Sequence, residues 1–581
     1  LKCCAPDSCH CFFATGVVVA SGVPVRGQDA DPANVVLPES RTDQTTLPSA
    51  VDLKGGRPRV DPASLTPART DLPDSVGDLM PPPTMSLPDQ PEQVRIKELR
   101  PLTLEEALQI AEVNSPTLKA VANQEQQAKA SLRAAISSWY PTVDLSANGL
   151  PEYFKSYSYR NPKYVTPTIL QPDPSRETYG REWRVGANLR VSWDLINPAR
   201  VPQIAAARDN YERVRDSYRI ALRDLRLQAA TSYFRLQESD EGVRIGQDSV
   251  RASLISLRDA RARYNAGVNT KLEVLESETQ LARDRRLLTD RLTTQELNRR
   301  NLARLMDLPQ DVTPTAATPA TPLGLWESSL QESITAAYQF REELDQLILD
   351  VSIANSQANA SLAAVQPVLS FVNSSNTFRV EGQSNRTSIG DIDMGDYRWG
   401  VDNSTALTAT WRLFDGGRAR AEYRRFKQAA EESEQNFAAT RDLIRFEVEE
   451  SFVGLRAAIQ SIETTSSEVI SSRESLRLSQ LRVQAGVSAQ REVVDNQRDL
   501  TSAEIGYAQA IRQYNTNLAE LRRRTGLDAL IACPTNALPS QKPEAAGIEM
   551  PIEPTPLKSA CTAVAAKGQT GSTSQPVQPL W

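Results

Sequence analysis

The chain has few of the side chains on which most catalytic and metal sites depend. Its 581 residues include one histidine, His10, five methionines and six cysteines. Four cysteines lie beside His10 near the N-terminus, while Cys533 and Cys561 lie in a proline-rich tail, where export would allow a disulfide. No glycine-rich phosphate loop precedes a helical pattern, and no nucleophile motif occurs. The sequence therefore predicts no catalytic residues, no cofactor and no bound metal ion.

The chain also lacks an excess of basic charge and long apolar runs. Its 66 basic and 72 acidic residues give a net charge of −6, so no basic field favours nucleic acid as a partner. No run of eighteen apolar residues follows the N-terminal segment, which excludes transmembrane helices from the predicted fold. Transmembrane strands are not excluded, because each needs only about 9–11 residues and half of these are polar.

Proline-rich segments lie near both ends of the chain and once in the middle. Lys2, followed by the apolar stretch 12–25, predicts a secretory signal. The proline-rich segments predict disorder or linkers. The chain then divides into a leader, a linker, a first unit, a connector, a second unit and a tail, over residues 1–30, 31–93, 94–308, 309–326, 327–530 and 531–581.

Two stretches, 183–195 and 399–413, alternate apolar and polar residues. A period of two with polar partners indicates a strand with one apolar and one polar face. The stretch 143–147 shows the same alternation, a fourth strand is expected over about 367–375, and we expect long loops over 151–181 and after 375. The apolar positions of the two main stretches are Trp183, Val185, Ala187, Leu189, Val191, Trp193, Leu195, Val401, Leu407, Ala409, Trp411 and Leu413.

Long helical patterns follow the two main strands directly. A helix predicted over about 199–264, and its counterpart over 418–483, would each be roughly 100 Å long at about 1.5 Å per residue. Gly267 and Gly486 turn the chain into return helices that end near residues 306 and 525. The apolar spacing within the first long helix is typical of a coiled-coil seam and comprises Leu222, Leu225, Ala229, Tyr233 and Leu236.

Shorter helices are predicted before each pair of strands. One covers about 103–138 and begins with a capping box formed by Thr103 and Glu106, and the other covers about 330–364. Each shorter helix plus a return helix matches the length of one long helix. Each unit would therefore supply two full-length helical columns.

The second unit repeats the first. Leu104 and Leu330 begin matching helices 226 residues apart (330 − 104), and Gly267 and Gly486 close matching helices 219 residues apart (486 − 267). The same order of helix, two strands and helical hairpin occurs in both units. The sequence therefore predicts two internal repeats in a mainly α-helical chain, with a pore wall of strands fused to a helical stalk.

Four strands per chain cannot close a barrel, and open strand edges are not tolerated in lipid. Three chains would supply twelve strands, within the range of outer-membrane barrels, together with twelve helical columns. The alternative is an elongated coiled-coil structural or adaptor protein without a pore. It explains the helices, but it gives no reason for tryptophans near the strand ends, where aromatic belts belong, at Trp183, Trp193, Trp399 and Trp411.

Over about residues 95–530 the chain resembles the TolC family of bacterial outer-membrane efflux proteins. One resembling motif opens the first helix, and Pro141 precedes the first strand. Another forms a strand-to-helix junction, and two further ones form hairpin tips, each followed by an acidic–apolar–acidic stretch. In order, these motifs are Leu104-Glu105-Glu106-Ala107-Leu108, Trp411-Arg412-Leu413-Phe414-Asp415-Gly416-Gly417, Ala266-Gly267-Val268 with Glu273 to Glu276, and Ala485-Gly486-Val487 with Glu492 to Asp495.

The resemblance implies a homotrimeric channel-tunnel with a twelve-stranded transmembrane β-barrel in outer-membrane lipid and an α-helical barrel in the periplasm. It also implies a periplasmic adaptor protein and an inner-membrane pump as partners, in a tripartite efflux or type I secretion system. The channel itself would be a passive duct, and the sequence leaves the cargo open among drugs, metal ions, glycolipids and proteins.

By position in the family pattern, Glu492 and Asp495 fall on an acidic ring at the periplasmic entrance, where three copies would concentrate cations. The first-unit pair, Glu273 and Glu276, is expected to face outward or toward the neighbouring helix. Some relatives close this entrance with an aromatic and a basic residue, but Val483 and Ser488 stand at those positions here. Arg482 or Arg491 would have to substitute.

Three further groups of residues are candidate functional sites. The hairpin tips, Ala266, Gly267, Val268, Ala485, Gly486 and Val487, are candidates for adaptor contact. The lipid-facing barrel surface is expected to include Val185, Leu189, Val191, Trp193, Leu407, Ala409 and Trp411. The strand-to-helix junction comprises Leu413, Phe414, Asp415, Gly416 and Gly417.

Overall fold

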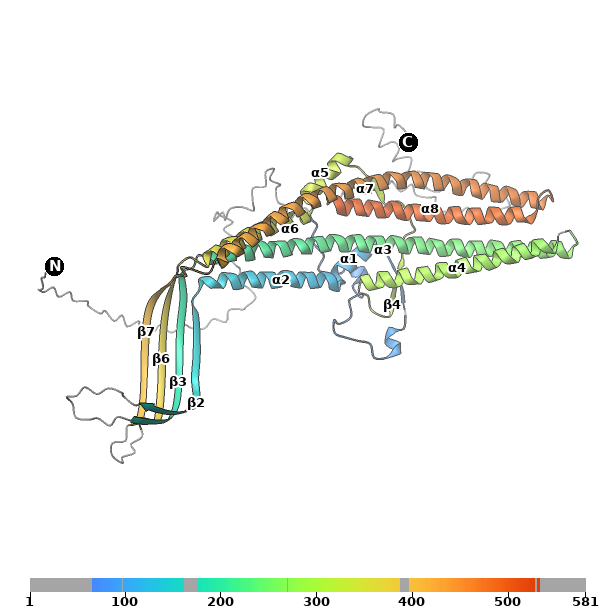
Figure 1. Ribbon diagram of the computed structural model, residues 1–581. Helices are drawn as coiled ribbons and strands as arrows, with labels where there is room; N and C mark the ends of the chain where they lie inside the picture. The colour runs from blue at the N-terminus through green and yellow to red at the C-terminus, as the bar shows by residue number, and fades with distance from the viewer. Residues whose placement is uncertain are drawn as a thin grey trace, which may run out of the picture. The chain divides into compact units, whose positions relative to one another are not determined.

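The computed structural model describes residues 65–96, 98–160, 176–268, 270–386, 396–527 and 530–532 (Figure 1). The predicted leader, the first part of the predicted linker, the tail after residue 532, His10 and all six cysteines lie outside these ranges. The described chain is mostly helical, with one large antiparallel sheet.

Four long helices form two hairpins, as the sequence predicts (Figure 1). They are α3 (Arg200–Asn265), α4 (Lys271–Leu305), α7 (Arg418–Gln484) and α8 (Gln490–Thr525). With 66 residues, α3 is about 100 Å long. None of the helices among the described residues combines the length and the apolar character that crossing a membrane requires.

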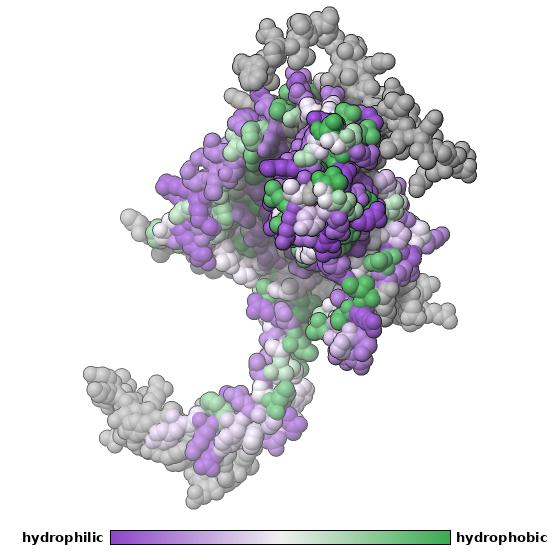
Figure 2. Space-filling model, turned by 90° about the vertical axis from the view of Figure 1, so that its right-hand side faces the viewer, coloured by the Kyte–Doolittle hydropathy of each residue, from purple (hydrophilic) through white to green (hydrophobic). Residues whose placement is uncertain are grey.

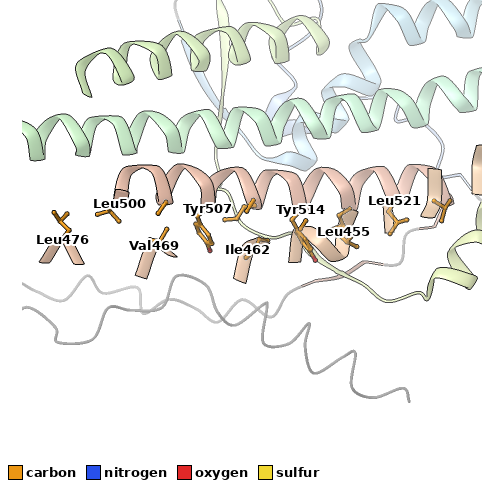
Figure 3. Packing of buried hydrophobic residues seen from close by; sticks show 14 of the residues in the cluster. Leu455, Ile462, Val469, Leu476, Leu500, Tyr507, Tyr514 and Leu521 are labelled. Atoms are coloured by element: carbon orange, nitrogen blue, oxygen red, sulfur yellow. The ribbon is translucent and has the colours of Figure 1, made fainter. Parts of the chain in front are cut away.

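A strict seven-residue repeat holds the second hairpin together (Figure 3). A seven-residue period keeps one stripe of each helix facing its partner, which winds the pair into a left-handed coiled coil. The buried side chains that follow this period are Leu455, Ile462, Val469 and Leu476 on α7, and Leu500, Tyr507, Tyr514 and Leu521 on α8.

The first hairpin changes character along its length. The predicted seam residues, from Leu222 to Leu236 on α3, are all buried in one apolar cluster. Toward the tip, Leu257, Ala260 and Leu281 remain buried, but polar side chains also occupy buried positions. These are Ser249, Ser253, Ser277, Gln280 and Asp284.

Four antiparallel strands form the large sheet in the order β2–β3–β6–β7. The predicted loops over 151–181 and after 375 are wrong in part, because the strands extend through residues 160, 176–181 and 386. Pro151 hid this continuation, and the sheet accommodates it with a register shift between Asn148 and Glu152. The strands are β2 (Thr142–Arg160), β3 (Arg176–Ile196), β6 (Val368–Arg386) and β7 (Asp396–Thr410).

Each predicted short helix is two helices. The first divides into α1 (Leu104–Asn114) and α2 (Pro116–Ile136), because Pro116 disfavours helical backbone at Ser115, whose hydroxyl then caps α2. The second divides into α5 (Leu330–Phe340) and α6 (Glu342–Ala363) at Arg341, without a proline. The predicted capping box of Thr103 and Glu106 is confirmed.

Part of the predicted disordered linker is ordered. Residues 65–96 include the short helices η2 (Asp74–Val76) and η3 (Pro91–Val94). Val76 and Leu79 are buried against α1 and α3, and the Asn114 amide donates to the Leu79 carbonyl at 2.8 Å. Apolar contacts and hydrogen bonds to the helices therefore hold a segment whose composition indicates disorder.

The predicted connector over 309–326 also carries structure. Its strand β4 (Val312–Ala316) pairs in parallel with β1 (Glu98–Leu102). Its strand β5 (Gly324–Trp326) pairs with β8 (Leu530–Ala532). Apart from these small sheets, the two halves have the same element order: α1–α2–β2–β3–α3–α4 and α5–α6–β6–β7–α7–α8.

Candidate functional site

Both hairpin tips end in the same hydrogen-bonded turn, where the sequence places them. At the first tip, the Val268 N–H donates to the Arg263 carbonyl at 3.0 Å and the Gly267 N–H donates to the Tyr264 carbonyl at 2.9 Å. This pair of bonds forms a Schellman motif, which favours a left-handed residue after the helix. Gly267 supplies that conformation with a φ of 73°.

The second tip repeats this turn around Gly486, whose φ is 74°. There the Val487 N–H donates to the Arg482 carbonyl at 3.0 Å. The valine after each glycine points into solvent, with exposures of 75% for Val268 and 68% for Val487. Figure 2 looks onto the ends of the hairpins and shows hydrophobic and hydrophilic residues interspersed there. The last residues before the glycines are Ala266 and Ala485.

Glu492 lies on the first turn of α8 and is bound from two sides. The Arg482 guanidinium donates to its carboxylate at 2.8 Å, and the Ser488 hydroxyl donates to the other carboxylate oxygen. Arg482 is one of the two basic residues that the sequence offered as substitutes at the entrance. The serine that departs from the family pattern therefore also contacts the acidic residue.

Asp495 lies one turn further along α8 and faces two arginines. Arg498 is 3.4 Å from its carboxylate and Arg491 is 3.8 Å away, and all three side chains are largely exposed. Exposed ion pairs of this kind contribute at most about 1 kcal/mol. Asp495 is thus less firmly held than Glu492.

Val483 stands where some relatives carry an aromatic closing residue, but its side chain is buried in the core between α7 and α8. Its backbone carbonyl accepts a hydrogen bond from the Arg263 guanidinium at 3.1 Å. Arg263 belongs to the other hairpin, so this bond joins the two tips. The link runs through the backbone of Val483, which sequence patterns do not reveal.

At the strand-to-helix junction, Asp415 caps the N-terminus of α7. Its carboxylate accepts hydrogen bonds from the backbone N–H groups of Gly417 at 2.8 Å and Ala419 at 2.7 Å. These hydrogen bonds lower the pKa of Asp415, and the one from the Ala419 N–H has the largest effect. Gly416 and Gly417 both have positive φ, which explains the glycine pair. The two residues before Asp415 are highly exposed and are Leu413 and Phe414.

Two tryptophans fasten the junctions in the same way. The Trp193 indole N–H donates to the Trp139 carbonyl at 2.9 Å, and the Trp411 indole N–H donates to the Val365 carbonyl at 3.1 Å. Each acceptor lies just after the helix that precedes the strands of its half, since α2 ends at Ile136 and α6 at Ala363. Sequence reasoning assigned these tryptophans to aromatic belts and missed the hydrogen bonds.

Cross-strand pairing places most predicted lipid-facing residues on one face of the sheet. Val191 lies opposite Val143 and Asn373, and Leu407 lies opposite Phe371. Residues directly paired across strands share a face. The predicted residues that the register places on this apolar face are Val185, Leu189, Val191, Trp193, Leu407 and Ala409. Trp411 follows the end of β7 at Thr410, so its assignment to a strand was wrong.

The apolar face also holds a group of neutral polar side chains on β6 and β7. The Asn373 amide donates to the Thr405 hydroxyl at 2.7 Å, and the Asn403 amide donates to the Ser375 hydroxyl at 2.6 Å. Mutual hydrogen bonds reduce the cost of placing such groups in an apolar medium. Further along the same face, the rings of Tyr153 and Trp183 pack with centroids 5.0 Å apart.

The opposite face is polar and carries a buried carboxylate. Glu182 accepts hydrogen bonds from the guanidinium of Arg184 at 3.0 Å and that of Arg398 at 3.3 Å. Arg398 lies on β7, two strands away from β3, and the strand between them has Gly382 opposite Glu182. The missing side chain at Gly382 leaves room for this pairing.

A second ionic cluster joins the hairpins to the break between α5 and α6. Glu343 binds Arg341 at 2.8 Å and Arg523 at 2.9 Å, and Arg523 also binds Asp224 at 2.7 Å. Burial alone would raise the pKa of Glu343, but the hydrogen bond and charge of Arg341 and the charge of Arg523 lower it to about 2. Asp224 and Arg523 lie far apart in the sequence, so this cluster could not be predicted from sequence patterns.

Among the described residues, no group of three or more histidine, cysteine, aspartate or glutamate side chains is arranged to hold a metal ion. The main features of the described chain are an amphipathic sheet, two helical hairpins with exposed valines at their tips, and two ion-paired acidic residues near the second tip.

Known proteins share this arrangement. The family model described as outer membrane efflux protein matches residues 107–307 and 334–527. A sequence comparison with curated proteins gives no match. Crystal structures of CusC share the fold with a TM-score of 0.57 and 18% identity, covering 79% of this chain and 99% of that chain.

Two further solved structures agree. The Campylobacter jejuni CmeC outer membrane channel has a TM-score of 0.55 at 14% identity, covering 77% of this chain and 94% of that one. The Neisseria gonorrhoeae MtrE outer membrane channel, solved in its open state, has a TM-score of 0.52 at 17% identity, covering 77% and 98%.

The family match extends over both halves of the chain and includes the four strands of the sheet and both long hairpins. It joins two segments that have the same order of elements, and it omits the connector between them. The chain belongs to the outer membrane efflux protein family.

Proposed function

We propose that three copies of this efflux protein close one channel across the outer membrane. The observation that carries this is the four-stranded sheet, in which no described strand pairs with the outer edges of β2 and β7. Unpaired backbone groups in lipid cost several kcal/mol each, so these edges need partners. Three copies bring β7 of one chain beside β2 of the next and give a barrel of twelve strands.

The dimensions of the apolar face support a membrane-spanning sheet. Trp183 and Trp193 lie on that face ten residues apart on β3, which is about 33 Å of extended chain. A tilt of about 40° reduces this to roughly 25 Å, the height of the apolar band of outer-membrane barrels. The tryptophans then lie at the two interfaces, with Val185, Leu189 and Val191 in lipid. The face with Glu182 lines the lumen.

The two halves are proposed to be copies of one unit, over residues 94–308 and 327–530. Their identical element order supports this, as do the tryptophan anchors. The acceptors Trp139 and Val365 are 226 residues apart (365 − 139), the same separation as that of Leu104 and Leu330. Two copies in each of three chains give pseudo-sixfold packing of the hairpins around a common axis.

The hairpin tips are proposed to bind a periplasmic adaptor, which connects the channel to an inner-membrane pump. The rigid Schellman turns hold Val268 and Val487 outward, where a partner can bury them at a gain of about 1.5–3 kcal/mol each. The channel is a passive duct of a tripartite efflux or type I secretion system, since the sequence offers no motif for nucleotide hydrolysis.

The periplasmic entrance is proposed to be ringed by Glu492 and Asp495. Three copies of each around a narrow axis would attract cations. Arg482 at Glu492, and Arg491 and Arg498 at Asp495, offset part of this charge. A coiled-coil scaffold without a pore is disfavoured, because it would not need a sheet with one apolar face and aromatic ends.

Single-channel recording in planar bilayers tests this proposal. The wild-type protein should conduct and prefer cations in a salt gradient. The double variant Glu492→Gln, Asp495→Asn should lower that preference, whereas the first-unit pair Glu273→Gln, Glu276→Gln, which removes the same charge, should leave it unchanged. Equal effects of the two double variants would remove Glu492 and Asp495 from the entrance, and the absence of any conductance would contradict the channel.

A further inference from the structure

A cavity lies between the two hairpins close to their tips. Its volume is about 350 Å³, and residues of α3, α4, α7 and α8 all line it. This volume falls at the lower end of the range of small-molecule sites. Most of the lining is made of hydroxyl and amide side chains, among them Ser253, Ser256, Gln280, Gln484, Gln490 and Gln497.

Gln280 brings an unsatisfied acceptor to this cavity. Its side chain is only 5% exposed, and its amide N–H donates to Asp284 at 2.9 Å. The Gln280 Oε1 atom is buried and has no donor among the described residues. A buried carbonyl oxygen without a donor destabilises the empty site, so a ligand that donates a hydrogen bond here removes that cost.

Asp284, directly behind Gln280, adds a negative charge. It is 4% exposed, and the hydrogen bonds that it accepts in the described chain come from the neutral groups of Ser253 and Gln280. The cavity wall also carries Asp259. Its one arginine, Arg263, already donates to the Val483 carbonyl at 3.1 Å. A buried carboxylate that lacks a basic partner favours a cation nearby.

We propose that this cavity binds a small organic amine, whose ammonium group donates to the Gln280 Oε1 atom and lies near the Asp284 carboxylate. An ammonium has only donors and a positive charge, which matches an orphaned acceptor beside an unneutralised acid. The valine and isoleucine side chains of the wall, Ile255, Val483, Val493 and Val494, cover the hydrocarbon part of the amine.

Such a ligand touches both hairpins at once. Close to the tips, the direct links between them are the Gln490 amide to the Ser256 hydroxyl at 2.7 Å and Arg263 to the Val483 carbonyl. An amine in the cavity adds to these links and stabilises the arrangement in which the two tips are joined by them, by mass action. This consequence rests on the proposed channel function, whereas the binding itself does not.

Isothermal titration calorimetry of the full chain in detergent, with 1,4-diaminobutane as the probe, tests the site. The wild type should bind the diamine and should not bind the neutral 1,4-butanediol. Gln280→Met should weaken binding about tenfold or more, because it removes the acceptor at nearly constant volume. Ala252→Trp should abolish binding by filling the cavity, and circular dichroism confirms that each variant folds.

Gln460→Met, at an exposed position of α7 outside the cavity, is the matched control and should bind like the wild type. No diamine binding to the wild type overturns the proposal. Equal binding by Gln280→Met and wild type also overturns it, because the diamine would then be held by surface acids. Calorimetry measures binding without requiring the protein to conduct. A failure to bind the diamine can therefore be distinguished from a failure of the proposed channel function.

Discussion

Replacing Glu343 by glutamine removes the carboxylate that binds both Arg341 and Arg523, and Arg523 in turn pairs with Asp224 in the first half of the chain. The pKa of Glu343 is lowered from 4.5 to about 2 in the folded protein. A lowered pKa contributes stability that is present above the unfolded value and is lost as the pH falls toward the folded value. A shift of this size corresponds to about 3 kcal/mol, which should disappear between about pH 5 and pH 2.

Guanidinium denaturation of the full chain in detergent, followed by helical circular dichroism, measures this contribution. At pH 7 the Glu343→Gln variant should be about 2–4 kcal/mol less stable than the wild type, because two buried arginines lose a shared partner. The difference should shrink toward pH 2, where the wild-type carboxyl also becomes neutral. Glu474→Gln is the matched control, since Glu474 pairs with Arg477 on an exposed face and such pairs contribute little. A constant difference between wild type and Glu343→Gln from pH 7 to pH 2 would refute this reasoning.

Three further predictions concern the sheet, the tips and the junctions. Val191→Lys should destabilise the membrane-inserted protein by about 2–4 kcal/mol while Ser192→Lys on the other face is tolerated, and refolding titrations into lipid vesicles measure both. Gly486→Ala should cost about 1 kcal/mol because of its positive φ, whereas Gly506→Ala within α8 should stabilise by about 0.5–1 kcal/mol, as thermal unfolding will show. Trp411→Phe loses the indole donor and should cost about 1 kcal/mol in the same assay.

Local periodicity was enough to predict the long helices and the sheet. The seven-residue apolar repeat on α7 and α8 and the alternation around Val191 are properties of short stretches of chain. The turns at Gly267 and Gly486 were also predictable, since few residues other than glycine adopt their backbone conformation. These features required no knowledge of distant contacts.

The missed features depend on contacts that local pattern does not encode. The break at Ser115 had a signal in Pro116, but the one at Arg341 has none and is stabilised by the ionic cluster around Glu343. The ordered part of the linker depends on scattered apolar residues, among them Val76 and Leu79, that become buried only when the helices are in place.

The location of the second hairpin tip was predicted from the sequence, but only some of the interactions there were. Sequence placed Glu492 near the tip, and the structure adds that Arg482 and Ser488 bind it. Ser488 and Arg482 precede Glu492 by four and ten residues, which a helical turn and the hairpin turn can bridge. The spacing of these residues was therefore a usable signal for both contacts. The bond from Arg263 to the Val483 backbone could not be anticipated, because a carbonyl acceptor leaves no trace in the sequence.

The most direct test of the account is the mass of the protein extracted from outer membranes, measured by light scattering with the detergent contribution subtracted. The account predicts a particle of three chains, each at most 64.0 kDa, because three four-stranded sheets form a twelve-stranded barrel in which the edges of β2 and β7 find partners. A stable monomer or dimer in that fraction would contradict the trimeric channel.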